Sequence, residues 1–146
     1  MTIQVKLTRS ENAEYFGMSV GDTVEIPLED YVFGVVASEI GNAHLEACKA
    51  QAVAARTKAM PYVQHGKPIS DSSSTVQAFR APRMDVSKYP AARSAVEATA
   101  GEVLTYSGKV IDTCAYSADN GGRTTSSEAR WGGYRAYLIE QDDPWD

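Results

Sequence analysis

The sequence is poor in cysteine and histidine, the residues from which disulfide frameworks and many metal sites are built. Its 146 residues include two cysteines and two histidines. Cys48 and Cys114 allow one disulfide at most, and their separation in sequence does not fix their distance in space. We expect two free and largely structural thiols, because a cysteine in an alanine-rich helix is commonly buried.

A metal site is a weak alternative for the same residues. His44 and Cys48 stand four residues apart, which suits two ligands on one helix face, and His65 and Cys114 would complete a tetrahedral set. These four residues are scattered, however, and the chain has no short paired cysteine spacing. We therefore expect no metal and no cofactor.

The chain also lacks a long hydrophobic run and an excess of positive charge. It carries 14 basic and 19 acidic residues, for a net charge of −5, which argues against a nucleic-acid partner. No run reaches the length of a membrane span, and the opening MTIQVKLTRSENAEYF lacks the apolar core of a secretion signal. Hydrophobic residues make up 43% of the chain, and its length predicts one globular domain over residues 1–146.

What the sequence does contain is a strongly helical stretch from Ile26 to Met60. Apolar residues recur there at intervals of three and four, as on the buried face of a helix: Leu28, Tyr31, Val32, Val35 and Val36. The next position on this stripe is Glu39. A carboxylate therefore stands where an apolar side chain is expected.

A tight corner and a second helix follow this first helix. Gly41 can end the first helix in the left-handed conformation, and Asn42 can cap a helix from Ala43 to Met60, which Pro61 closes. Glycine inside a helix costs about 1 kcal/mol relative to alanine. We therefore expect Gly34 to mark a close approach of another element.

The remaining segments predict short strands and one more helix. They are strands at 3–7 and 23–26, a loop or loose hairpin over 10–22 that leads into the second of these strands, a helix over 87–100, a hairpin of 102–106 and 109–116 around Ser107-Gly108, and a helical turn at 126–130. Helices first and a hairpin later predict an α+β fold.

Glu39, Lys49 and Arg56 form the first candidate site. Lys49 and Arg56 lie two helical turns apart on one face, so both cations could converge on the Glu39 carboxylate. The alternative is structural: a helix-end carboxylate, with Lys49 and Arg56 paired to Glu39 or Asp30 to fix the corner. The pattern alone favours this structural alternative, since ion pairs of this kind are common.

A thiol or serine hydrolase is the other enzyme class to weigh. Cys114 or Ser117 would be the nucleophile, with His44 or His65 as its base. No nucleophile elbow or cysteine-protease signature surrounds these residues, which argues against this class.

Four segments resemble the SpoIID/LytB family of bacterial cell-wall proteins, in the family's order. They are IPLEDYVFGVVASEI, LEACKAQAVAARTKA, AVEATAGEVLTYSGKVIDTCAYSADNGGRTTSSEARWGG and YLIEQDDPWD. The resemblance implies a single SpoIID-like domain that acts outside the cytoplasm, at the cell wall. Because the family continues past the last of these motifs, a truncated C-terminus is one expectation.

The family resemblance implies that the chain is a lytic transglycosylase of peptidoglycan, with Glu39 at the position of the catalytic glutamate. The acid protonates the bond between N-acetylmuramic acid and N-acetylglucosamine, and the muramic C6 hydroxyl then closes a 1,6-anhydro ring. Since the attacking group belongs to the substrate, the second carboxylate of ordinary glycosidases is not required. The family acts on glycan stripped of stem peptides, which implies an N-acetylmuramoyl-L-alanine amidase as partner.

The resemblance also implies a set of substrate-binding residues: Lys49, Arg56, Gln77, Tyr116, Ser117, Gly121 and Gly122. Many relatives carry histidine at the position of Tyr116. Some relatives bind zinc through a loop that here reads DSSSTVQ, without histidine or cysteine. Bracing of this loop is the alternative role for Gln77 and for Asp71, and Trp131 and Tyr134 can either stack on sugars or anchor the fold.

The second functional hypothesis is a glycan-binding module that stimulates an amidase without catalysis, as the LytB name implies. Formation of anhydro ends separates the two hypotheses, because binding alone makes none.

Overall fold

The structure is a computed structural model that describes residues 1–112, 114–116 and 120–145. The chain divides into two compact units, Met1–Cys114 and Ala115–Asp146, which we describe one at a time. That they form one domain stays a prediction.

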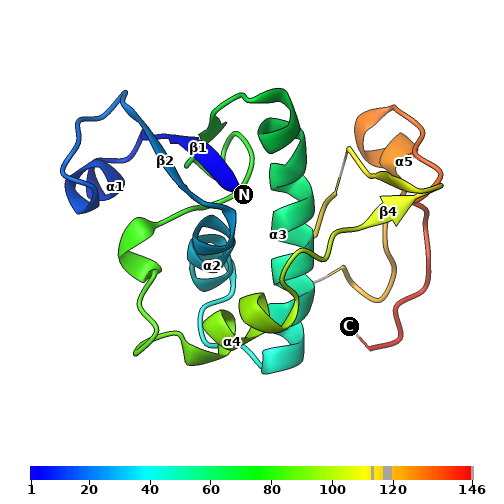
Figure 1. The fold of residues 1–146 in the computed structure, drawn as a ribbon. Helices are drawn as coiled ribbons and strands as arrows, with labels where there is room; N and C mark the ends of the chain where they lie inside the picture. Colours follow the sequence, from blue (N-terminus) through cyan, green and yellow to red (C-terminus); the bar gives the residue numbers. More distant parts are fainter. Residues whose placement is uncertain (113, 117–119, 146) are drawn as a thin grey trace. The chain divides into compact units, whose positions relative to one another are not determined.

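A small sheet forms at the start of the first unit. β1 (Thr2–Lys6) pairs antiparallel with β2 (Thr23–Pro27) and parallel with β3 (Ile69–Ser70), in the order β2-β1-β3 (Figure 1). Alternate residues of β1 are buried, so one face of the strand belongs to the core. The two predicted strands are confirmed, and β3 was not predicted because two residues carry no periodicity.

Helix α1 (Ser10–Tyr15) lies in the segment that was predicted as a loop or loose hairpin. The strands on either side of it do pair antiparallel, but the helix itself was not predicted. Its Asn12 side chain is fully buried: Nδ2 donates to the Phe79 carbonyl at 2.9 Å, and Oδ1 accepts from the Ala81 N–H at 2.7 Å. These partners are more than 60 residues away in sequence. Contacts that no local pattern reveals therefore hold this short helix.

The predicted helix pair is confirmed as α2 (Leu28–Glu39) and α3 (Leu45–His65), with Gly41 between them in the left-handed conformation at φ 59°. The prediction of Asn42 as the cap of α3 was wrong. His44 caps the helix instead, and its Nδ1 accepts from the Glu46 N–H at 3.3 Å.

The prediction that Pro61 closes α3 was also wrong, because Pro61 lies inside the helix. Helix α3 ends one turn later at Gly66, which has a φ of 61°. An interior proline costs about 3 kcal/mol. The last turn places Tyr62 and Val63 against the hydrophobic core, and this burial offsets the lost hydrogen bond.

The rest of the first unit contains three predicted elements, each shorter than predicted: α4 (Pro90–Ala98), β4 (Thr105–Tyr106) and β5 (Lys109–Val110). It also contains the 3-10 turn η1 (Ala81–Arg83), which was not predicted. β4 and β5 form the predicted hairpin, with Ser107 and Gly108 at positive φ as a two-residue turn requires. In the second unit, α5 (Ser127–Trp131) confirms the predicted helical turn. The fold is α+β, as predicted.

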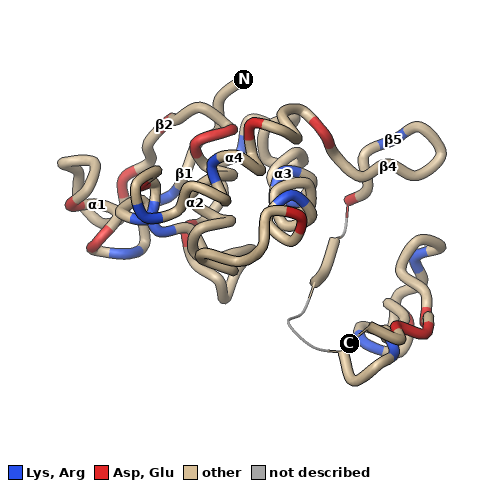
Figure 2. Tube along the Cα trace, turned by 90° about the horizontal axis from the view of Figure 1, so that it is seen from below, with Lys and Arg blue, Asp and Glu red and all other residues tan. Residues whose placement is uncertain are grey.

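Helices α2, α3 and α4 pack on one another and form most of the core of the first unit (Figure 1). Basic and acidic residues are interspersed along the described chain (Figure 2). Within the described ranges, no helix has the length and apolar character needed to cross a bilayer.

Gly34 marks the close approach that the sequence predicted. A Cβ atom at this position would lie 2.4 Å from Cε2 of Phe79, whose buried ring stacks on Tyr31. Because the ring is enclosed, it has little room to yield to an added methyl group.

Substitution of Gly34 by alanine is therefore expected to lower the free energy of unfolding by about 1–3 kcal/mol, through overpacking. Urea unfolding followed by circular dichroism measures this change. The matched control is Gly133→Ala, since a Cβ placed there meets none of the described residues within 4 Å, its two chain neighbours aside. Equal unfolding midpoints for the two variants would contradict the packing argument.

Candidate active site at the end of helix α2

Glu39 is the last residue of α2 and is half-buried. Its Oε1 accepts a hydrogen bond from the Ala78 N–H at 2.8 Å. Its Oε2 has no hydrogen-bond partner among the residues that the structure describes. One oxygen of the carboxyl group is therefore fixed, and the other is available for proton transfer.

The neighbouring Ser38 holds the same segment of chain. Its Oγ accepts from the Arg80 N–H at 3.0 Å and donates to the Gly34 carbonyl at 2.6 Å. We call residues 77–80 the clamped segment, because the end of α2 binds its backbone at two points. This segment sets the direction from which Glu39 is held.

Gln77, at the start of the clamped segment, lies inside the protein. Its Nε2 donates to Tyr31 Oη at 3.2 Å and to the Ala55 carbonyl at 3.1 Å, and the residue is 2% exposed. Gln77 Oε1 and Gln51 Nε2 are buried without a partner in the described structure. The Gln77 amide thus links α2, α3 and the clamped segment.

Asp71 is a fully buried carboxylate. It accepts from the backbone N–H groups of Thr8 and Arg9, at 3.0 and 3.2 Å, from the Thr8 hydroxyl, and from Asn12 Nδ2 at 2.8 Å. Its own carbonyl accepts from the Phe79 N–H at 3.2 Å. Asp71 therefore fastens α1 to the loop that leads into the clamped segment.

The two candidate cations do not share a partner with Glu39. Lys49 Nζ lies 2.8 Å from Glu46 Oε1 and is one-third exposed. Lys49 and Arg56 were expected to converge on Glu39. Among the described residues, they form no direct ion pair with it.

Arg56 is 1% exposed and forms a two-pronged pair with Glu29, at 3.0 Å through Nε and 2.6 Å through Nη2. Its Nη1 donates to the Glu102 carbonyl at 2.9 Å. The structural alternative, pairing of Arg56 with Glu39 or Asp30, named the wrong carboxylate. Glu29 in the first turn of α2 takes that place, because it faces α3, and Asp30 pairs with Arg93 at 3.2 Å instead.

The thiols have the surroundings of structural residues. Both are free, and burial raises the pKa of Cys48 and the pKa of Cys114 above their usual value. A raised pKa lowers the thiolate fraction at neutral pH, which disfavours nucleophilic catalysis. Over the described ranges, no group of three or more His, Cys, Asp and Glu residues could hold a metal ion.

The second unit contains the remaining predicted site residues, of which Ser117 lies outside the described residues. Gly121 and Gly122 both have positive φ, and the Gly122 carbonyl accepts from the Asp143 N–H at 2.8 Å. The glycine pair therefore forms a tight turn against the end of the chain.

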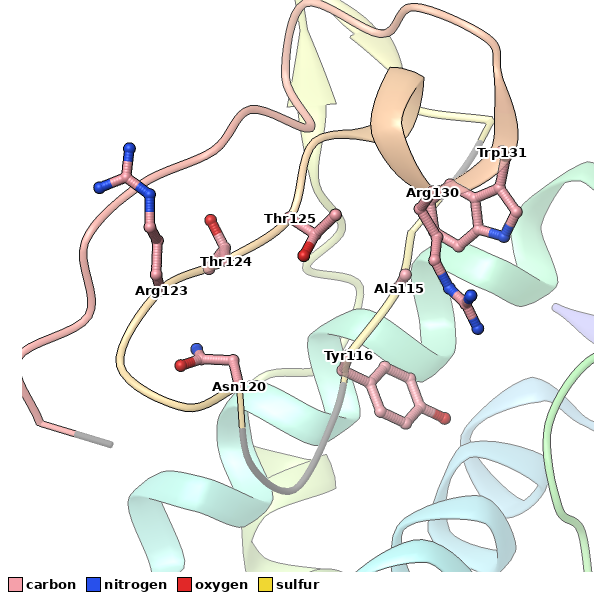
Figure 3. A pocket seen from close by; sticks show the side chains of 8 residues that line it. All are labelled: Ala115, Tyr116, Asn120, Arg123, Thr124, Thr125, Arg130 and Trp131. Atoms are coloured by element: carbon pink, nitrogen blue, oxygen red, sulfur yellow. The ribbon is translucent and has the colours of Figure 1, made fainter.

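Tyr116 lines a cavity of about 630 Å³ in this unit (Figure 3). The other lining residues are Ala115, Asn120, Arg123, Thr124, Thr125, Arg130 and Trp131. Of these, sequence reasoning singled out Trp131 alone. The signal that it missed is a pair of arginines: Arg123 directly precedes the two threonines, and Arg130 directly precedes Trp131.

Comparison with known proteins gives a consistent result. The SpoIID family, described as Stage II sporulation protein, matches residues 17–106, which include Glu39 and the clamped segment. Stage II sporulation protein D of Bacillus amyloliquefaciens is 34% identical over 137 residues, and that of Bacillus subtilis is 33% identical over 138. Each match covers 83% of this chain and 40% of the relative, so the chain spans less than half of their length.

A third relative is the Amidase enhancer of Bacillus subtilis, which is 38% identical over 114 residues, or 77% of this chain and 15% of that protein. The family match covers more than half of the chain and contains the helix pair and the Glu39 site. This chain belongs to the SpoIID family.

Proposed function

We propose that this chain is a lytic transglycosylase that cleaves the bond between N-acetylmuramic acid and N-acetylglucosamine in bacterial cell-wall glycan, with Glu39 as its general acid. The observation that carries the proposal is how the two oxygens of the Glu39 carboxyl group are hydrogen-bonded. The Ala78 N–H holds Oε1, while Oε2 is without a partner among the described residues. An acid that is held through one oxygen can present its proton in a fixed direction.

The proposed reaction needs one protein carboxyl group. Glu39 donates its proton to the glycosidic oxygen as the bond from that oxygen to the muramic C1 breaks, which frees the N-acetylglucosamine hydroxyl. The muramic C6 oxygen bonds to C1, and its proton returns to the Glu39 carboxylate. No water is consumed, so the muramic product carries a 1,6-anhydro ring and Glu39 is restored.

The other predicted site residues fall into two groups according to the solvent exposure of their side chains. Arg56 and Gln77 are almost completely buried, and we assign them to positioning α2, α3 and the clamped segment. Lys49 is partly exposed, and we assign its ammonium group to contact with the glycan. Tyr116, with the turn at Gly121 and Gly122, is assigned to glycan binding in the second unit.

The name of the third relative supports a cell-wall role in company with an amidase. An N-acetylmuramoyl-L-alanine amidase would strip the stem peptides and supply the bare glycan that this chain cleaves. The site of action is accordingly outside the cytoplasm, at the wall. The same name also favours the second candidate function, a glycan-binding module that stimulates an amidase without cleaving the glycan itself.

A digestion experiment separates these two functions. Purified peptidoglycan, intact or stripped of peptides by an amidase, is incubated with the protein, and the products are identified by mass spectrometry. We expect 1,6-anhydro-muramic ends, more of them from stripped glycan. Faster amidase action without anhydro ends would contradict the transglycosylase and support the binding module.

A further inference from the structure

The last two residues of α2 bind alternate N–H groups of the clamped segment. Glu39 Oε1 accepts from the Ala78 N–H at 2.8 Å. Ser38 Oγ accepts from the Arg80 N–H at 3.0 Å, and Arg80 has extended backbone angles, φ −126° and ψ 104°. In an extended chain the N–H groups of residues i and i+2 point to the same side. One side of the segment is therefore held by a serine hydroxyl and a carboxyl group together.

The opposite side of the clamped segment is held by other elements of the first unit. The Phe79 N–H donates to the Asp71 carbonyl at 3.2 Å, and the Phe79 carbonyl accepts from Asn12 Nδ2 at 2.9 Å. These bonds fasten the segment to α1 and to the loop that precedes it. Its register on the last turn of α2 is left to the bonds made by Ser38 and Glu39.

Arg83 reaches the same turn of α2 but binds it differently. Its Nη1 donates to the Ala37 carbonyl at 3.1 Å. This contact is made by the end of a long side chain, whereas Ser38 and Glu39 bind the backbone of the clamped segment directly. The position of the Ala78 N–H therefore depends more on Ser38 than on Arg83.

The Ser38 hydroxyl group is itself fixed in direction. It donates to the Gly34 carbonyl at 2.6 Å, the bond that a serine within a helix often makes to the carbonyl four residues before it. Because the hydroxyl proton points along α2, a lone pair of Oγ is left for the Arg80 N–H. A single oxygen atom thus joins the backbone of α2 to the backbone of the clamped segment, one residue before Glu39.

We propose that Ser38 is a positioning residue for Glu39, acting through the clamped segment. The link runs from Ser38 Oγ to the Arg80 N–H, along the backbone through Phe79, and from the Ala78 N–H to Glu39 Oε1. Without the hydroxyl group the segment loses one of its two backbone bonds to the end of α2, and the Ala78 N–H is free to shift. The inference rests on the proposed function, in which the Glu39 carboxyl group is the acid.

The test compares Ser38→Ala with the wild type on soluble, peptide-stripped glycan strands, with kcat and KM taken from the formation of 1,6-anhydro ends. We expect kcat to fall about 10- to 100-fold and KM to stay within about twofold, because Ser38 positions the acid and does not bind the glycan. Ser38→Thr keeps the hydroxyl group and should restore kcat to within about threefold of the wild type. In the Glu39→Gln background, Ser38→Ala should cost less than about threefold, since no acid remains to be positioned.

Thr57 in α3 offers a matched control. Its Oγ1 also donates to the carbonyl four residues before it, that of Val53, at 2.7 Å, and accepts a backbone N–H, that of Leu104, at 2.9 Å. Thr57→Val therefore removes the same two kinds of bond from partners outside the clamped segment. It should leave kcat within about twofold of the wild type, and unfolding curves establish that each variant is folded. Equal losses of kcat in Ser38→Ala and Thr57→Val would overturn the positioning role.

Hydrogen exchange of the Ala78 amide, followed by NMR, gives a readout that does not need activity. We expect exchange to accelerate at least about 10-fold in Ser38→Ala and to be unchanged in Thr57→Val. Faster exchange in Ser38→Ala, with no anhydro ends from the wild type, would retain the link from Ser38 to Glu39 and overturn the transglycosylase. With anhydro ends from the wild type, an unchanged kcat, an unchanged Ala78 exchange rate or a change confined to KM in Ser38→Ala would overturn the positioning role and leave the transglycosylase in place.

Discussion

Glu39→Gln is expected to lower the rate of anhydro-end formation by about 10²- to 10⁴-fold, the usual contribution of a general acid. Glutamine has nearly the same shape as glutamate, and its carbonyl oxygen can still accept from the Ala78 N–H, the bond that is 2.8 Å long in the native protein. The variant therefore keeps the clamped segment in place but has no acidic proton to donate. Initial rates on amidase-stripped glycan, read by mass spectrometry, measure the loss.

The matched control for this variant is Glu14→Gln. Glu14 is an exposed carboxylate of α1, and its replacement should leave the rate within about twofold of the wild type, since surface changes rarely exceed about 0.5 kcal/mol. Unfolding curves establish that both variants are folded. Full activity of folded Glu39→Gln would remove Glu39 from the reaction.

Asp71→Asn is expected to lower the free energy of unfolding by about 3–5 kcal/mol, the range for disruption of a buried, fully hydrogen-bonded charge. The native carboxylate accepts from two backbone N–H groups, a hydroxyl group and the Asn12 amide. Asparagine replaces one acceptor oxygen with an NH₂ group that faces these donors. Buried donors then lose their partner, and α1 is no longer fastened to the loop before the clamped segment.

Urea unfolding of the same variant measures this change, with Asp22→Asn as the matched control. Asp22 is exposed, and its side chain accepts from the Ser19 N–H at 3.0 Å. We expect the control to lose at most about 1 kcal/mol, the net value of one exposed hydrogen bond. An equally small loss for Asp71→Asn would contradict the fastening role of this carboxylate.

The parts of the fold that were predicted correctly are those with a local pattern. The stripe from Leu28 to Val36 predicted α2, and the pair Ser107-Gly108 predicted the hairpin. Gly34 was read correctly as a close approach, because a helical glycine needs a packing reason. Local chemistry is enough where a single element determines its own conformation.

The parts that were missed depend on contacts between distant segments. Helix α1 is held by Asn12 and Asp71, and the end of α3 continues through Pro61 because its last turn is packed. The partner of Arg56 is likewise set by how α2 and α3 face each other, which places Glu29 opposite the guanidinium. Spacing along one helix carries no information about such pairing.

The same contrast between local patterns and distant contacts applies to the candidate site. Glu39 stood out because it breaks an apolar stripe, and in the structure its carboxyl group accepts a hydrogen bond from the Ala78 N–H of the clamped segment. The cavity around Arg130 and Trp131 was not predicted, since its lining combines helix α5 with residues from separate segments near Tyr116 and Arg123, and no local pattern shows that these segments meet.

The central claim is that the muramic C6 hydroxyl, and not water, attacks the anomeric carbon after Glu39 has protonated the leaving oxygen. The most direct measurement is digestion of amidase-stripped glycan in water enriched in ¹⁸O, with mass analysis of the muramic ends. The proposed mechanism predicts 1,6-anhydro ends that contain no ¹⁸O. Reducing muramic ends carrying ¹⁸O would show hydrolysis instead, and would contradict it.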